Sequence, residues 1–229
     1  ITTGARNVIL GRLAGDAITT SVENVAVGNS ALGQSTTGYQ NIAVGDGSMA
    51  GADVTGYGNS IMGDNAGYAM TTGYHNTAVG VSSMISNTEG YQSVAIGAYA
   101  LDANTTGDNH VAIGLHALGA NTTAVDNVAV GMSALAANTT GHNLVAVGTN
   151  ALDANTTGTH NVGIGHHALG ANTTGTYNVA VGINTLDANT TASNNTAVGY
   201  GALGASVTTG QHTAMGYNAL TACDTGTNN

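Results

Sequence analysis

The sequence predicts an all-β fold, a parallel β-roll or β-solenoid of about thirteen coils with 17 residues each. Three observations lead to this prediction. A short phrase recurs along the whole chain, and one copy of it reads SVAIGAYALDANTTG. Proline, phenylalanine and tryptophan are absent, and charged residues make up only 6% of the chain. Each copy holds short apolar runs and turn residues, in too few positions for a strand followed by a helix.

The repeat is anchored on a glycine that follows an apolar triplet. Anchor glycines are 17 residues apart, except for one interval of 18 between Gly45 and Gly63. The thirteen anchors are Gly11, Gly28, Gly45, Gly63, Gly80, Gly97, Gly114, Gly131, Gly148, Gly165, Gly182, Gly199 and Gly216. Since no linker or change in composition divides the array, we expect a single repeat domain over residues 1–229. We expect it to be open at both ends and part of a longer fibre.

The consensus unit reads N-V-A-V-G-x-x-A-L-x-A-N-T-T-G-x-x. In NVAVG the two valine positions lie two residues apart and share one face of a strand, while asparagine and alanine share the other. We expect the valine face to form the core, with the AL pair as a second apolar site. The NTTG segment has the chemistry of a corner, because asparagine tolerates left-handed backbone and glycine permits positive φ.

One coil cannot be stable alone. Two valines and a leucine give about 5–8 kcal/mol of apolar transfer free energy. Ordering the backbone costs roughly 1–2 kcal/mol for each residue, which exceeds that gain over one repeat. Neighbouring coils must supply the difference through backbone ladders and a shared core, and stacking in register requires near-identical repeats.

The middle position of the triplet is restricted to small residues in most copies. Because this face points away from the predicted valine core, its small size indicates close packing against another surface. We therefore predict a homo-oligomer with these alanines at the interface, and the alternative is a monomer whose second sheet covers them. The predicted interface residues are Ala26, Ala43, Ala78, Ala95, Ala112, Ala129, Ala146, Ala180, Ala197 and Ala214.

The segments Ser93–Leu101, His110–Leu118 and Asn161–Leu169 resemble head-domain repeats of trimeric autotransporter adhesins. The chain is also similar to repeat segments of bacteriophage tail fibres. The resemblance implies a left-handed parallel β-roll with three chains around an axis, displayed outside the cell. The period is longer than that of the usual adhesin-head repeat, so the bacterial and the phage interpretation both stay open.

Charge and motifs exclude several classes of function. The net charge is −10, with Arg6 and Arg12 as the only fixed cations, which argues against nucleic-acid binding. No apolar run reaches the length needed to span a bilayer, so we expect no direct membrane insertion. The chain has no nucleophile elbow, zinc-protease motif or phosphate-binding loop, and its acidic residues are isolated. We expect no enzyme, cofactor or metal site, and the single cysteine, Cys223, cannot form an intrachain disulfide.

Four tyrosines occupy the same repeat position in consecutive coils, six residues before the anchor glycine. They are Tyr39, Tyr57, Tyr74 and Tyr91. Stacked coils would place them in a file on the outer surface, where aromatic rings can bind sugars or proteins. The alternative is a purely stabilising stack between coils.

The later coils carry the segment ANTTG or ANTTA six times. An outward file of asparagine and the second threonine would suggest a monomeric ice-binding protein as an alternative function. The asparagines are Asn104, Asn121, Asn138, Asn155, Asn172 and Asn189.

Together these observations predict a structural and adhesive segment of an extracellular trimeric fibre, from a phage tail or a bacterial surface. Its partners would be two further copies of the chain and a host or surface receptor such as a glycan.

Overall fold

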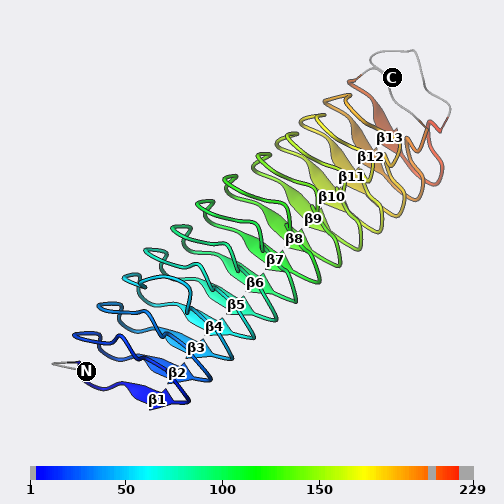
Figure 1. The fold of residues 1–229 in the computed structure, drawn as a ribbon. Coiled ribbons are helices and arrows are strands. Elements are labelled where there is room, and N and C mark those ends of the chain that lie inside the picture. Colours follow the sequence, from blue (N-terminus) through cyan, green and yellow to red (C-terminus); the bar gives the residue numbers. More distant parts are fainter. Residues whose placement is uncertain (1–3, 206–209, 222–229) are drawn as a thin grey trace. The chain divides into compact units, whose positions relative to one another are not determined.

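The structure is a computed structural model that describes residues 4–205 and 210–221, and it confirms the predicted parallel β-solenoid (Figure 1). Cys223 lies outside the described residues. The chain separates into two compact units, Ile1–Leu115 and His116–Asn229. The single domain predicted from the sequence and the trimer stay predictions.

Each coil contributes one strand of three residues. In the first unit the strands are β1 (Val8–Leu10), β2 (Val25–Val27), β3 (Ile42–Val44), β4 (Ser60–Met62), β5 (Thr77–Val79), β6 (Val94–Ile96) and β7 (Val111–Ile113). In the second unit they are β8 (Val128–Val130), β9 (Val145–Val147), β10 (Val162–Ile164), β11 (Val179–Val181), β12 (Thr196–Val198) and β13 (Thr213–Met215). Within each unit the order of strands in the sheet is their order in the chain.

Neighbouring strands pair in parallel and in register, so that equal repeat positions lie above one another. In β6 and β7, for example, Val94 pairs with Val111 and Ala95 with Ala112. The 18-residue interval does not disturb this register, since Ile42 still pairs with Ser60. In-register stacking is what the near-identical repeats predicted.

The two faces of the strands are the reverse of the prediction. The middle residue of the triplet points into the coil, and Ala95 in β6 is 0% exposed. The flanking residues point outward, and Ile96 of the same strand is 40% exposed. The interior is narrow at this level: an ideal Cβ on Gly163 would lie 3.1 Å from the carbonyl oxygen of Ala168 and 3.2 Å from Cγ of Leu152. The coil's own interior, and not a second chain, therefore selects small residues.

Two of the exceptions to alanine support this explanation. Where the middle residue is isoleucine, at Ile9 and Ile61, the leucine position of the same coil is glycine, at Gly15 and Gly67. A Cβ on Gly67 would lie 3.2 Å from Cγ2 of Ile61. The larger residue thus fills the space that leucine fills elsewhere, which keeps the packing density of the interior.

The leucine of the AL pair is buried in a backbone conformation that is unusual for its type. Leu135 is 0% exposed and has φ of 54°, and Leu118, Leu152 and Leu169 share both properties. Left-handed backbone costs a residue with a Cβ roughly 1–2 kcal/mol. Full burial of a leucine side chain offsets this cost, at about 1.5–3 kcal/mol.

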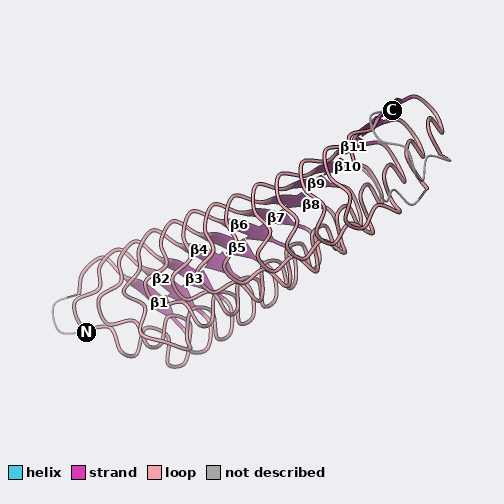
Figure 2. Ribbon diagram, turned by 90° about the horizontal axis from the view of Figure 1, so that it is seen from above, coloured by secondary structure: helices cyan, strands magenta, loops and turns pink. Residues whose placement is uncertain are grey.

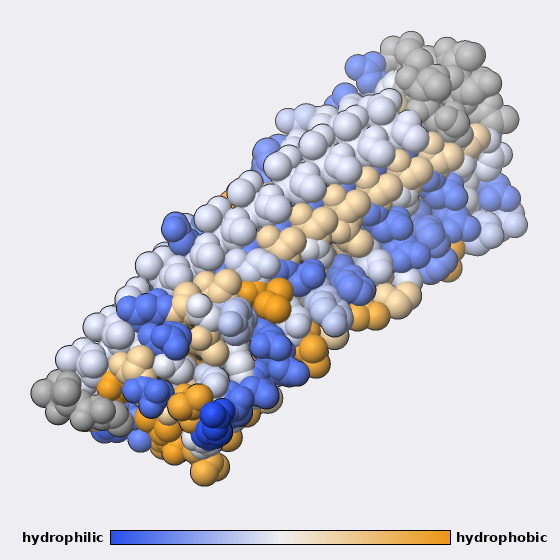
Figure 3. Space-filling model, viewed as in Figure 1, coloured by the Kyte–Doolittle hydropathy of each residue, from blue (hydrophilic) through white to orange (hydrophobic). Residues whose placement is uncertain are grey.

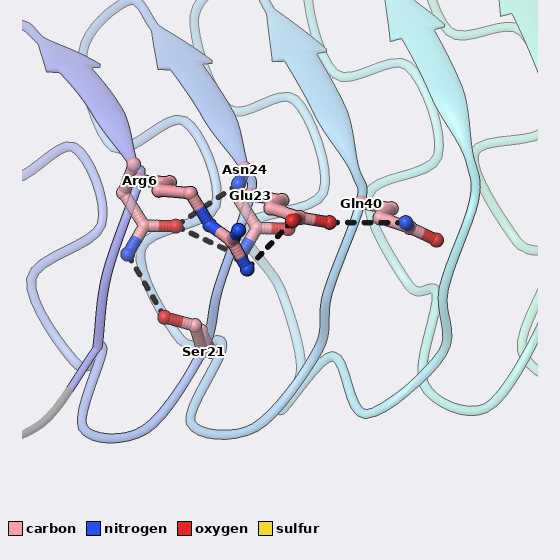
Figure 4. A network of polar contacts seen from close by, with 6 residues as sticks. Arg6, Ser21, Glu23, Asn24 and Gln40 are labelled. Carbon is pink, nitrogen blue, oxygen red and sulfur yellow. Dashed lines mark hydrogen bonds and ion pairs between the residues drawn. The ribbon is translucent and has the colours of Figure 1, made fainter.

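Two ladders of asparagine side chains run through the interior. In the first, four residues before the anchor, Asn24 donates from Nδ2 to the carbonyl oxygen of Gly38 at 2.9 Å, and its Oδ1 accepts from the backbone N–H of Asn41 at 2.9 Å. Figure 4 shows this ladder at its beginning, where the backbone N–H of Asn24 donates to Asn7 at 2.9 Å. Buried amides are thus paired from coil to coil, as buried polar groups must be.

The anchor glycine and the corner glycine have different structural roles. The anchors have φ between 119° and 144°, a range that side chains disfavour, and a Cβ on Gly131 would lie 2.6 Å from the backbone carbon of Gly148. The corner glycines do not have positive φ, contrary to the prediction. A Cβ on Gly141 would collide with the carbonyl oxygen of Gly158 and would lie 2.5 Å from Oδ1 of Asn138, so glycine relieves crowding around the buried amide here. Alanine occupies the same corner position in two other coils, at Ala124 and Ala192.

Candidate functional site

The outward residues of the strands form an apolar surface, which we call the valine–isoleucine face. It consists of the first and third residues of each strand, and Figure 2 shows the strands side by side along one side of the coils. Val79, Ile96 and Ile113 are 36–40% exposed in the first unit, and Ile164 is 39% exposed in the second. Strands about 4.8 Å apart give each unit a flat apolar strip of roughly 300 Å². The largest apolar patch on a typical soluble monomer has about this size and is often functional, which makes the face a candidate interaction surface.

The alanines predicted as the subunit interface do not lie on this face. All ten are enclosed by their own coil, with exposed fractions of 0–1%. They are Ala26, Ala43, Ala78, Ala95, Ala112, Ala129, Ala146, Ala180, Ala197 and Ala214. Since none has surface to offer a second chain, the interface assignment is wrong at these residues.

The four tyrosines form the file that the repeat spacing predicts. The ring centroids of Tyr39 and Tyr57 are 4.8 Å apart, those of Tyr57 and Tyr74 are 5.3 Å apart, and those of Tyr74 and Tyr91 are 4.7 Å apart. The rings are stacked within 7° of parallel, so each covers its neighbour's face. His75 contacts Tyr57 and Tyr74 edge-on. The file therefore offers ring edges and hydroxyl groups, and sugar stacking between the rings is blocked.

The second unit has aromatic contacts that the sequence analysis did not identify. The ring of His160 stacks on Tyr177 at 4.9 Å and meets His142 edge-on at 5.6 Å. His142 and His160 lie in neighbouring coils, six and five residues before their anchor glycines. A comparison of repeat positions across coils could have found this contact. Among residues 4–205 and 210–221, no group of three or more His, Cys, Asp or Glu side chains could hold a metal ion.

The prediction of an outward file of asparagine and threonine is wrong for the asparagines, which point into the coil. Asn104, Asn121, Asn138, Asn155, Asn172 and Asn189 are at most 1% exposed, and they form the second interior ladder. The first threonine of four triplets donates its hydroxyl to the next coil, as Thr139 does to the carbonyl oxygen of Thr156 at 3.1 Å. The second threonine of each triplet, such as Thr140 or Thr157, is exposed, and in the last triplet the first threonine, Thr190, is exposed as well. On the side seen in Figure 3, residues of near-neutral hydropathy form a regular band.

Charged contacts are few and lie at the surface. Arg6 pairs with Glu23 at 2.7 Å, and Gln40 donates to the other carboxylate oxygen of Glu23 at 3.0 Å (Figure 4). In the second unit, desolvation raises the pKa of Asp153 and of Asp187, while His167 opposes both shifts. An exposed ion pair contributes little to stability, and none of these groups forms a catalytic arrangement by itself.

A groove crosses the first coils of the first unit, and the sequence analysis did not identify it. Its volume is about 330 Å³ and its lining includes Leu13, Asp16, Ser30, Asp46, Asn65 and Tyr68. We call it the Tyr68 groove. These residues come mainly from two turn positions, the second and the fifth after the anchor glycine. The residue types at these positions differ from coil to coil, so no consensus residue marks the groove in the sequence.

No family model matches the chain, and no match was found among curated proteins or solved structures. In the described parts of the chain, nothing helical has the length and apolarity to cross a membrane.

Proposed function

We propose that the chain is a structural and adhesive segment of an extracellular fibre, in which three copies associate through the valine–isoleucine face. This face is the observation that carries the proposal. It repeats along the coils, and valine and isoleucine occupy most of the positions where a solvated sheet would carry polar residues. Serine or threonine stands at the first position of β4, β5, β12 and β13. Every copy presents a surface of the same spacing and chemistry, so three such faces could pack against one another around a common axis.

The number of chains and the setting come from the resemblance to adhesin heads and phage tail fibres. Either origin, a bacterial cell surface or a virion fibre, would use a solenoid of this kind to extend and present a surface for a receptor. In-register coils suit this task, because each coil is fixed by its neighbours through backbone hydrogen bonds. The fibre would thereby present its variable turn positions at fixed spacing.

Sedimentation equilibrium tests the association. The wild-type chain is expected to have three times the monomer mass. The double variant Val130→Lys/Val147→Lys places two charges in the middle of the face of the second unit and is expected to be monomeric. The matched control Thr140→Lys/Thr157→Lys adds the same charge at exposed threonines of the same unit and should stay trimeric. A monomeric wild type would refute the proposal.

Ice binding is the second candidate, and it now depends on the exposed second threonines alone. One threonine per coil at a spacing of about 4.8 Å is the observation in its favour. The test is thermal hysteresis of the chain in freezing solution. A monomer with hysteresis that is lost in Thr140→Lys/Thr157→Lys would favour this alternative over the fibre.

A further inference from the structure

We propose that the Tyr68 groove binds an uncharged saccharide, with Tyr68 as the surface on which a sugar ring stacks. The inference rests on the proposed function, because it identifies the chemistry of the receptor that the fibre would present itself to. Tyr68 differs from the tyrosine file in the accessibility of its ring to a sugar. The rings of the file cover one another, whereas Tyr68 is 43% exposed and lines an open groove.

Tyr68 is held flat against the wall of the groove by a glycine. The backbone N–H of Gly51 donates to the carbonyl oxygen of Tyr68 at 2.8 Å, which places the two residues side by side in adjacent coils. A Cβ on Gly51 would penetrate the tyrosine ring and lie 2.8 Å from its Cζ atom. Since Gly51 does not have positive φ, its backbone does not require glycine. Glycine is needed at position 51 because the tyrosine ring occupies the space of a Cβ. In several other coils alanine occupies the equivalent position, for example Ala120 and Ala137.

Polar groups with fixed orientation lie along the groove. The carboxylate of Asp46 accepts a hydrogen bond from Nδ2 of Asn29 at 2.9 Å. Asn65 donates from Nδ2 to Asp64 at 2.9 Å, and its Oδ1 therefore lies over Gly47, where a side chain would collide with it. Carboxylate and amide oxygens accept hydrogen bonds from hydroxyl groups. An aromatic ring beside such acceptors matches a sugar, which has an apolar face and a rim of hydroxyls.

Size and charge restrict the ligand further. The volume of about 330 Å³ is at the lower end for small-molecule sites, so the groove suits the end of a short glycan. Asp16 and Asp46 are both in the lining and both exposed, and the lining contains no Lys or Arg. These carboxylates repel uronic acids, sialic acid and sulfated sugars. Neutral hexoses and N-acetylhexosamines are therefore the expected class.

Saturation-transfer NMR on the full chain tests this inference with defined probes. The probes are the methyl glycosides of glucose, galactose, mannose and N-acetylglucosamine, with those of glucuronic acid and sialic acid as the anionic set. At least one neutral glycoside is expected to bind at a concentration of about 10 mM or below, and to bind more tightly than any anionic one. Tyr68→Ala should weaken that binding about tenfold, through loss of the stacking surface. Gly51→Ala should also weaken it, because it displaces the ring without removing it.

The matched control is Tyr99→Ala, which removes a tyrosine of the same unit with a similar exposed fraction, 41%. It should bind like the wild type. Circular dichroism of each variant separates loss of the site from loss of the fold. The inference is overturned if no neutral glycoside binds to the wild type, if an anionic one binds best, or if Tyr68→Ala and Tyr99→Ala bind alike. Sedimentation of the same samples distinguishes failure of the saccharide proposal from failure of the fibre proposal. A trimer that binds no sugar refutes saccharide binding in the Tyr68 groove and leaves the trimeric fibre standing.

Discussion

Asn155→Ala is the substitution for which the structure gives the clearest energetic expectation. The side chain is 0% exposed in the second asparagine ladder. Its Nδ2 donates to Oδ1 of Asn138 at 2.9 Å and to the carbonyl oxygen of Gly158 at 3.0 Å, and its Oδ1 accepts from Asn172 at 2.9 Å. The substitution removes all three hydrogen bonds and leaves their partners buried.

The magnitude follows from the number of bonds. Three bonds at about 0.5–1.5 kcal/mol each give about 1.5–4.5 kcal/mol, and the partners that remain buried without a bond add to this. We expect the free energy of unfolding to fall by about 3–5 kcal/mol. The control Asn143→Ala removes an exposed asparagine whose Nδ2 lies 3.3 Å from His160. Because Asn143 has φ of 56°, a conformation that asparagine tolerates better than alanine, this control should cost about 1 kcal/mol or less.

Urea unfolding followed by circular dichroism measures both variants, and hydrogen exchange locates the change. Peptides that cover the second unit should lose protection in Asn155→Ala more than peptides of the first unit. If the unfolding midpoints of Asn155→Ala and Asn143→Ala coincide, the ladder does not stabilise the coil and the reasoning is refuted.

A related test replaces a run of the ladder at once. In the first coils the equivalent position carries no amide: Ile18, Val54 and Met70 are apolar and buried there, and Ser35 is a buried serine. A coil can therefore do without the amide when its neighbours also lack it. The triple replacement of Asn138, Asn155 and Asn172 by methionine should cost less than the sum of the three single replacements, because it removes donors and acceptors together.

The remaining predictions concern single positions. Gly131→Ala should lower the thermal midpoint strongly, because the new Cβ would collide with the next coil. Gly170→Ala, whose Cβ would lie 3.3 Å from its nearest neighbour, should change the midpoint little, and thermal melts compare the two variants. Burial raises the pKa of Asp153 while His167 opposes the shift, so its ionisation costs stability as the pH rises from about 3.9 through the higher folded pKa. Asp153→Asn should thus raise the thermal midpoint near pH 7 and leave it unchanged near pH 3, and an equal gain at both contradicts this. Tyr57→Ala interrupts the tyrosine stack and should lower the unfolding free energy by about 1–3 kcal/mol, and an unchanged urea midpoint would show that the stack contributes nothing.

The sequence was sufficient for the period, the strand positions and the stacking register, because these depend on one repeated spacing. It was not sufficient for the direction of the side chains. Strand alternation separates the valines from the alanines but does not say which set points inward. The answer depends on Leu152 and its equivalents, which fill the interior opposite the strand and leave room only for a small residue such as Gly163. That packing is a property of the closed coil.

The same limit explains the errors at the corners. In the segment Asn138–Gly141 the residue types are those of a turn. The sequence therefore predicts a left-handed backbone for the asparagine and a positive φ for the glycine. In the structure the asparagine is an interior hydrogen-bonding group and the glycine makes room for it. The Tyr68 groove was missed for a different reason. Its residues lie at equal repeat positions in successive coils, but these positions carry different residue types in each coil, so the consensus does not mark them.

The one interval of 18 residues shows where the solenoid accepts added length. The extra residue falls at the corner around Asp53, whose carboxylate accepts hydrogen bonds at 2.9 Å from the backbone N–H and the hydroxyl of Thr36. Val54 still enters the interior, and the strands on either side keep their pairing. We therefore expect this corner to be the place where an inserted peptide, engineered or acquired in evolution, disturbs the strand pairing least.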